Sequence, residues 1–255
     1  MDSILLNINT NDLNIRNTHD FTIQFDSLQL DHNADYHIAL VSYNIPYTWY
    51  NISVSQGNNQ FRYSPDAINY YTVTIPDGNY GIDDLNIELQ DLIVANGHTA
   101  DVITFSGDYN SMRADLQITN IAWRVDFRDI NSPNNFRNIL GFNNQEYSGA
   151  DGNLFRAENR ANITNDIDSV SINVSIVDSG AILLNNRQSS SLYHITDYGA
   201  GAGSYLTARV PYPIYLPINL KGNIHNIHIS IRNQSDQIID LNGEHIVLSL
   251  HLKKM

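Results

Sequence analysis

The chain has 255 residues, of which 42% are hydrophobic and only 16% are charged, and its formal net charge is −13. Because it contains no cysteine, disulfide bonds and thiolate metal sites are excluded. A nucleic-acid backbone is bound by clustered Lys and Arg. Here the lysines are Lys221, Lys253 and Lys254 and the arginines are scattered, so we expect no nucleic-acid partner.

The hydropathy pattern predicts neither a membrane span nor a signal peptide. No apolar run approaches the ~18 residues that a membrane-spanning helix needs. The first residues also lack the basic region that opens a signal peptide. All-β domains of this length are common as single units, so we expect one domain over residues 1–255.

The N-terminal part predicts strands, because apolar and polar residues alternate as the two faces of a strand require. This alternation holds over residues 4–8, 21–25 and 36–45. A bend rich in aromatic residues follows. Its rings could form a carbohydrate-binding platform, or they could seal one end of a β-sandwich as packing residues. The candidate contact residues of this bend are Tyr47, Trp49 and Tyr50.

One amphipathic helix is predicted after a strand at residues 70–75 and a turn at 76–79. Asp83 is the expected N-cap, with Ile82 placed to pack on Ile87. Asn96-Gly97 supplies a left-handed exit. The apolar stripe that would face the core consists of Leu85, Leu89, Leu92 and Ile93.

The middle of the chain predicts a hairpin over residues 102–118 and one helical turn over 136–142, closed by Gly141. The stretch 143–167 is polar and weakly periodic, and we expect it to be a long surface excursion. Alternation returns over residues 170–176 and again in the last 30 residues.

The C-terminal stretch is the strongest strand signal in the sequence. Apolar residues alternate with polar residues over 227–231 and again over 246–252. Between these runs, Asn242-Gly243 tolerates the positive φ of a tight hairpin turn. We therefore expect two adjacent strands, and for the whole chain an all-β antiparallel sandwich with one amphipathic helix.

Histidines are the candidates for a metal or contact site. By alternation His228, His245 and His251 share the polar face of the terminal strands. A bound metal would need ligands that point into the sandwich together with a spaced Glu, whereas His228 points away from the apolar core. We interpret these three as surface or subunit-contact histidines and expect no metal and no cofactor.

No catalytic constellation rises above chance. The sequence has no Gly-x-Ser-x-Gly elbow, and the serines at 189–191 lie in a polar turn. The carboxylates Asp166 and Asp168 lie on one strand face and do not flank a substrate from separate elements. We expect a protein that is not an enzyme.

Three segments stand in a distinctive order. They are YTVTIPDGNYGIDDLNIELQDLI at 71–93, the hairpin and short helix ending in ILGF at 139–142, and the closing IIDLNGEHIVLSLHLKK at 238–254. This order resembles the jelly-roll capsid proteins of virophages, Polinton-type elements and related DNA viruses, and it is most similar to their penton or minor capsid proteins. The resemblance covers roughly residues 70–142 and 213–254.

The resemblance implies a single jelly roll with loop and hairpin insertions, including a possible elaboration around residues 98–168. It implies a homopentamer that closes the fivefold vertices of a virion and contacts the major capsid protein, made in the host cell. Two alternatives stay open. One is a minor or cementing capsid protein, and the other is a carbohydrate-binding β-sandwich that uses the aromatic bend.

Overall fold

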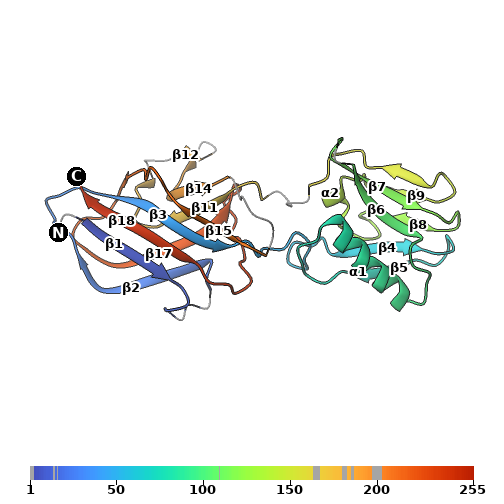
Figure 1. Cartoon of the computed structure of the whole chain (residues 1–255), viewed down its shortest axis with the longest axis horizontal. Helices are drawn as coiled ribbons and strands as arrows, with labels where there is room; N and C mark the ends of the chain where they lie inside the picture. Colours follow the sequence, from blue (N-terminus) through green and yellow to red (C-terminus); the bar gives the residue numbers. More distant parts are fainter. Residues whose placement is uncertain are drawn as a thin grey trace. The chain divides into compact units, whose positions relative to one another are not determined.

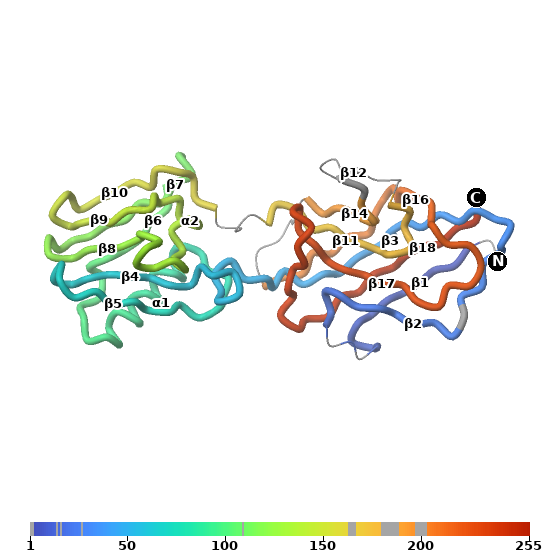
Figure 2. Tube along the Cα trace, turned by 180° about the vertical axis from the view of Figure 1, so that it is seen from behind, coloured from blue at the N-terminus to red at the C-terminus, as the bar shows by residue number. Residues whose placement is uncertain are grey.

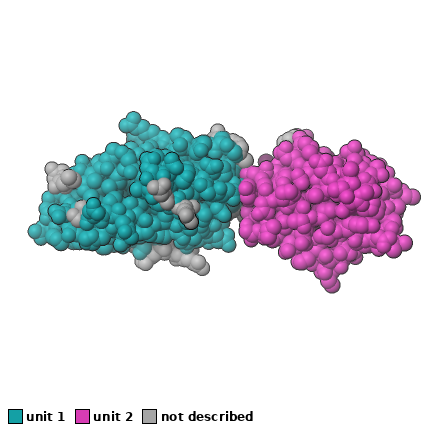
Figure 3. Space-filling model, turned by 90° about the horizontal axis from the view of Figure 1, so that it is seen from below, with its two compact units in different colours: residues 1–49, 167–255 teal, residues 50–166 magenta. Residues whose placement is uncertain are grey.

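A computed structural model describes residues 3–13, 15, 17–108, 110–162, 167–179, 183–184, 187–196 and 203–255. The chain divides into two compact units (Figure 3). Unit 1 consists of Met1–Trp49 and Ile167–Met255, and unit 2 consists of Tyr50–Asp166. Each unit has its own hydrophobic core.

Unit 1 is an antiparallel sandwich of two sheets (Figures 1 and 2). The first sheet has the order β1-β18-β3-β15, and β16 pairs with β3 beside it. Its strands are β1 (Ser3–Asn9), β18 (Val247–Lys254), β3 (Tyr36–Pro46), β15 (Tyr205–Arg209) and β16 (Leu216–Pro217). The second sheet has the order β14-β11-β17-β2. Its strands are β14 (Ser191–Ile195), β11 (Val170–Val174), β17 (Asn223–Asn233) and β2 (Asp20–Gln29).

The path of the chain through these sheets is that of a jelly roll. β1, β3, β15 and β18 lie in one sheet, whereas β2, β11, β14 and β17 lie in the other. Successive strands of these two sheets therefore change sheet, except at the step from β15 to β16 and at the step from β11 to β14. A short hairpin of β12 (Leu183–Leu184) and β13 (Arg187–Gln188) interrupts that step. The all-β antiparallel sandwich predicted from the sequence is confirmed.

The C-terminal strands obey the predicted alternation but not the predicted pairing. Ile227, Ile229 and Ile231 of β17 are fully buried, as are the leucines of β18. These strands lie in opposite sheets, so the expected hairpin between them is wrong. The physical reason is the link 234–246, in which Ile239 and Leu241 enter the core as the chain crosses between the sheets. Its Asn242-Gly243 turn has the expected positive φ, 54° and 79°.

Unit 2 combines two small sheets with two helices in its described residues. One sheet has the order β5-β4-β8-β9 and the other has the order β10-β7-β6. The first contains β5 (Tyr71–Thr74), β4 (Gln60–Ser64), β8 (Arg124–Asp126) and β9 (Glu146–Ser148). The second contains β10 (Leu154–Arg156), β7 (Arg113–Ile118) and β6 (Ile103–Asp108). The helices are α1 (Ile82–Ala95) and α2 (Arg137–Leu140).

The division into units differs from the single domain expected over residues 1–255. The elaboration expected around 98–168 is only part of unit 2, which already includes β4, β5 and α1. These earlier elements share one aromatic core with the later strands. Phe61 stacks on Phe136 with ring centroids 5.5 Å apart, and Phe127 lies edge-on to Phe61 at 6.3 Å. Residues on both sides of position 98 therefore contribute to the same hydrophobic core and belong to one folded unit.

Helix α1 is confirmed with a shifted start. Its N-cap is Gly81, whose backbone N–H donates to Asp84 Oδ2 at 3.3 Å, so Asp83 is not the cap. Ile82 is then the first residue of the helix rather than the residue before its cap, and Ile87 is 64% exposed, so the staple expected between them does not apply. The predicted stripe faces the core, with Leu85, Leu89 and Ile93 buried and Leu92 partly buried.

Two side chains of α1 bond to the backbone of the edge strand β6. Asn86 donates to the Phe105 carbonyl at 2.6 Å and accepts from the Phe105 N–H at 2.8 Å. One turn later, Gln90 donates to the Ile103 carbonyl at 2.8 Å and accepts from the Asp101 N–H at 2.7 Å. The helix thus satisfies backbone groups that an open sheet edge would leave to another chain.

The hairpin β6–β7 and the helical turn α2 are confirmed, and Gly141 ends α2 in the left-handed region at φ 84°. The expected excursion over 143–167 is wrong in part, because it contains β9 and β10. Both strands have three residues, too few to show periodicity, and backbone pairing to β8 and β7 defines them. The glycine-rich stretch 198–202 lies outside the described residues.

Candidate functional site

The aromatic bend does not form an open platform. The Trp49 side chain is 4% exposed and belongs to the core of unit 1, with the Tyr47 ring tilted against it at a centroid distance of 4.3 Å. Tyr47 and Tyr50 are partly exposed. A sugar stacks on an exposed ring face, which Trp49 does not offer. The geometry favours the packing interpretation of this cluster.

The three candidate histidines do not share one face, so that prediction is wrong. His228 lies on β17 and His251 on β18, which belong to opposite sheets. His228 Nε2 is 2.6 Å from Asp20 Oδ1, and His251 Nδ1 is 2.6 Å from the Tyr215 hydroxyl. His245 precedes β18, and its Nδ1 lies 3.2 Å from the hydroxyl of Thr10. Each histidine thus has a separate polar partner.

In the described part of the chain, no group of three or more His, Asp or Glu side chains is arranged to hold a metal ion. Among the same residues, no helix has the length and apolar character required to cross a bilayer.

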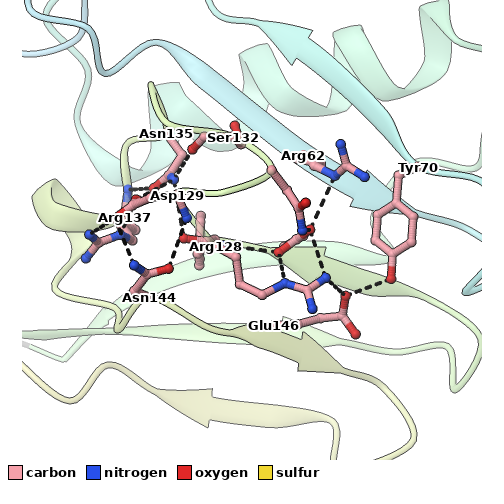
Figure 4. A network of polar contacts seen from close by, with 12 residues as sticks. Arg62, Tyr70, Arg128, Asp129, Ser132, Asn135, Arg137, Asn144 and Glu146 are labelled. Atoms are coloured by element: carbon pink, nitrogen blue, oxygen red, sulfur yellow. Dashed lines mark hydrogen bonds and ion pairs between the residues drawn. The ribbon is translucent and has the colours of Figure 1, made fainter.

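A network of polar contacts in unit 2 joins Arg62, Tyr70, Arg128 and Glu146 (Figure 4), and Asp126 lies at its centre. The Asp126 side chain is fully buried at the end of β8. Arg128 donates to it from Nε at 2.7 Å and from Nη2 at 3.0 Å. Asn131 donates at 2.8 Å, and Arg62 of β4 forms an ion pair with it at 3.3 Å.

The network extends from Asp126 to the neighbouring strands. Arg128 Nη2 also donates to Glu146 of β9 at 2.7 Å, and the Tyr70 hydroxyl donates to the same carboxylate at 2.7 Å. The Arg62 guanidinium lies over the Tyr70 ring, 4.7 Å from its centroid. These contacts join β4, the start of β5, β8 and β9 across the whole sheet.

Charge pairing in this cluster shifts the pKa of its members. Burial by itself raises the pKa of Asp126, but the hydrogen bonds from Arg128 and Asn131 outweigh it and hold the pKa below its ordinary value. The bond to Asp126 raises the pKa of Arg128. Burial and then the bond to Glu146 raise the pKa of the Tyr70 hydroxyl. All three groups are therefore held in their ordinary charge states at neutral pH.

A second pair of charges fixes the loop that follows β8. Arg137 donates to both carboxylate oxygens of Asp129, at 3.1 and 2.9 Å, and this bond lowers the pKa of Asp129. Asn144 donates to the same carboxylate at 2.8 Å. Asn135 donates to the Ser132 carbonyl at 2.5 Å within the loop. The loop is tied to α2 and to the segment before β9.

This cluster stabilises the fold of unit 2 and offers no group suited to catalysis. A general base or a nucleophile needs a group whose charge state can change near the working pH, whereas here every charge is matched by a partner. The cluster holds a short-stranded sheet together by its side chains. The sequence contained one signal for it, because Asp126 stands between the apolar residues Val125 and Phe127. Glu146, which shares Arg128 with Asp126, lay in the stretch expected to be a surface excursion.

Comparison with known proteins rests on structure alone, since no family model and no curated protein matches the sequence. A crystal structure of the mavirus penton protein superposes with a TM-score of 0.53. The match covers 99% of this chain and 100% of that chain, at 12% identity. The protein has the same fold as the mavirus penton protein.

A chain from the cryo-EM structure of the Sputnik virophage also matches. The match covers 100% of this chain and 98% of the Sputnik chain at 14% identity. Its TM-score of 0.41 is too low to support an argument. The penton-like jelly roll expected from three sequence segments is thus confirmed as a fold. The similarity to the mavirus penton protein extends over both units, including the parts that no segment of the resemblance covered.

Proposed function

We propose that the protein is a structural component of a viral capsid and that it acts as the penton, a homopentamer that closes each fivefold vertex. The observation that carries the proposal is the full-length match to the mavirus penton protein, which includes unit 2 as well as the jelly roll. The major capsid protein is its expected neighbour, and the virion is its expected location.

The physical features of the chain support a role in assembly rather than in catalysis. In the polar cluster around Asp126, each charged side chain pairs with one of opposite charge, and the pKa shifts of Asp126, Arg128 and Tyr70 keep these three groups in their ordinary charge states. The jelly roll presents two different flanks, one formed by β1 and β2 and the other by β14 and β15. A ring needs two such unlike surfaces on each subunit, because a cyclic contact joins one patch to a different patch of the next copy.

Native mass spectrometry of the purified chain tests this role. A penton gives a closed assembly of five copies, each of 28.8 kDa. A minor or cementing capsid protein instead binds the major capsid protein without forming a closed five-membered ring. If the folded chain stays solitary at every concentration, including in the presence of the major capsid protein, the proposal is wrong.

A further inference from the structure

The charge of the chain is distributed unevenly along its sequence. It contains 27 Asp and Glu residues, yet none of them falls between residues 198 and 235. The described part of this stretch forms β15, the loop to β16, and β17. Its cations are Arg209, Lys221 and Arg232. Lys221 pairs with Asp35 and Arg232 pairs with Asp236, so Arg209 is the cation of the stretch that has no ion pair among the described residues. In a protein with a net charge of −13, a region without acidic residues is the natural counterpart of an acidic surface.

This region exposes side chains that protein interfaces favour. Tyr205 of β15 is 51% exposed, and Tyr212 and Ile214 of the following loop are 88% and 72% exposed. Arg209 is also exposed, and no ion pair to it occurs among the described residues. Tyr and Arg are enriched at the energetic centres of interfaces. We call Tyr205, Arg209, Tyr212 and Ile214 together the β15 flank.

The β15 flank is held in place by β3. The backbone N–H of Val210 donates to the Val41 carbonyl at 2.8 Å, and β16 pairs with β3 at Ile38 and His37. The Tyr215 hydroxyl lies 2.6 Å from His251 on β18. The exposed side chains between these anchors therefore project from a fixed backbone, which lowers the entropy lost when a partner binds.

The opposite edge of the sandwich has the complementary character. Leu5 of β1 is 57% exposed, and Leu13 of the loop between β1 and β2 is 46% exposed. Asp12 in that loop and Asp26 on β2 are exposed, and neither forms an ion pair within the described residues. We call these four residues the β1–β2 flank. It contains two apolar side chains and two negative charges, whereas the β15 flank contains apolar and aromatic side chains and the positive charge of Arg209.

Topology places the two flanks on opposite sides of one rigid sandwich. β1 and β15 are the two edge strands of the first sheet, and β2 and β14 are those of the second. Each edge strand has one neighbour, so its other side carries backbone groups that a further chain can bond. We infer that the β15 flank of one copy docks against the β1–β2 flank of the next copy around the ring. This inference rests on the proposed pentamer.

Charge reversal with rescue tests the contact. Arg209→Glu and the paired change Asp12→Lys with Asp26→Lys each place like charges across the contact. We expect each to raise the protein concentration needed for half assembly at least tenfold in mass photometry. Combining all three changes in one chain restores the attraction, so assembly recovers to within about threefold of wild type. Arg160→Glu, at an exposed arginine of unit 2, is the matched control. It changes the net charge by the same amount as Arg209→Glu, and we expect it to shift the assembly concentration far less than tenfold.

A second variant tests the apolar part of the contact. Ile214→Asp puts a charge into the β15 flank, and Ile130→Asp puts the same charge on unit 2, where Ile130 is 90% exposed. We expect Ile214→Asp to prevent assembly and Ile130→Asp, which adds the same charge, to weaken it only slightly. Circular dichroism checks that both variants keep the wild-type fold, because such exposed positions tolerate substitution.

The outcomes separate this inference from the proposed function. If wild type forms a pentamer and all flank variants assemble equally well, the contact lies elsewhere and the penton role stands. If the flank variants remain pentameric but lose binding to the major capsid protein, the occupant of the β15 flank is that protein, and the inference is overturned. If wild type never forms a closed ring, both the penton role and the inference fail.

Discussion

At the scale of single residues, Asp126 illustrates how a buried charge is stabilised. Its side chain is fully buried, and it accepts hydrogen bonds from Arg128 and Asn131 while pairing with Arg62. A carboxylate removed from water is stable only if partners replace its hydration. The arginines reach solvent at one end, so the cluster joins the interior of unit 2 to its surface.

Replacing Asp126 by Asn keeps the shape of the side chain and removes its charge. Arg62 and Arg128 then lose their buried partner, and we expect unit 2 to lose about 3 kcal/mol of unfolding free energy in urea denaturation. Arg156→Ala is the control, because Arg156 pairs with Asp115 and Asp108 at the surface and such pairs contribute little. Equal effects of the two changes would contradict a stabilising role for the buried network.

The pH dependence of unfolding checks the same point. The pKa of Asp126 is lower in the folded protein than its ordinary value of about 3.9. Its contribution is therefore fully present above pH 4 and is lost as the pH falls through the folded pKa. We expect Asp126→Asn to flatten the loss of stability between about pH 4 and pH 2. An unchanged slope would mean that other carboxylates dominate acid unfolding.

At the scale of elements, α1 does more than cover a core. Its buried stripe packs on the interior of unit 2, while Asn86 and Gln90 bond to the edge of β6 from the flank of the helix. The spacing of four residues places both amides on one side of the helix. A sheet edge that would otherwise be open is thereby closed by side chains.

Asn86→Ala removes two hydrogen bonds to Phe105 and leaves its backbone groups without partners. We expect a loss of about 1–3 kcal/mol in unfolding free energy and faster hydrogen exchange at the Phe105 amide. Asp91→Ala, on the exposed face of the same helix, controls for helix propensity and leaves that exchange unchanged. If Asn86→Ala also leaves it unchanged, the amide is protected by something other than this side chain.

At the scale of the whole molecule, charge opposes assembly while the flanks promote it. Each copy carries a net charge of −13, so five copies in a ring repel one another. Added salt weakens the repulsion between charges that lie farther apart than the screening length, which is about 10 Å at 0.1 M and about 3 Å at 1 M. Close pairs at a contact are screened less, because water is excluded there. The balance between repulsion of whole subunits and attraction at the flanks therefore depends on ionic strength.

We expect pentamer formation to become more favourable as salt increases from 0.05 to 0.5 M, because the repulsion between whole subunits is screened first. Analytical ultracentrifugation at fixed protein concentration measures the change. Asp83→Asn with Asp91→Asn, at two exposed acids of α1 in unit 2, makes the net charge less negative and should reduce the salt requirement. A pentamer yield that is flat across this range would show that net charge does not govern assembly.

Local patterns were sufficient for the elements themselves. Alternation identified β17 and β18 as half-buried strands, the apolar stripe identified α1, and the glycine after Leu140 ended α2. The order of three segments pointed to the jelly-roll capsid fold. Each of these features depends on neighbours within a few residues, which the sequence contains directly. The N-cap of α1 was missed because Gly81 has no side chain that marks a helix start.

Only the tertiary structure decided which elements pack together. It placed β17 and β18 in opposite sheets, separated Tyr50–Asp166 as a second unit, buried Trp49, and brought Glu146 to Asp126 through Arg128. An alternating pattern shows that one face of a strand is buried, but any apolar face in the chain can cover it. The choice of partner depends on the combined packing of distant segments, and that information is not carried by any one stretch of the sequence.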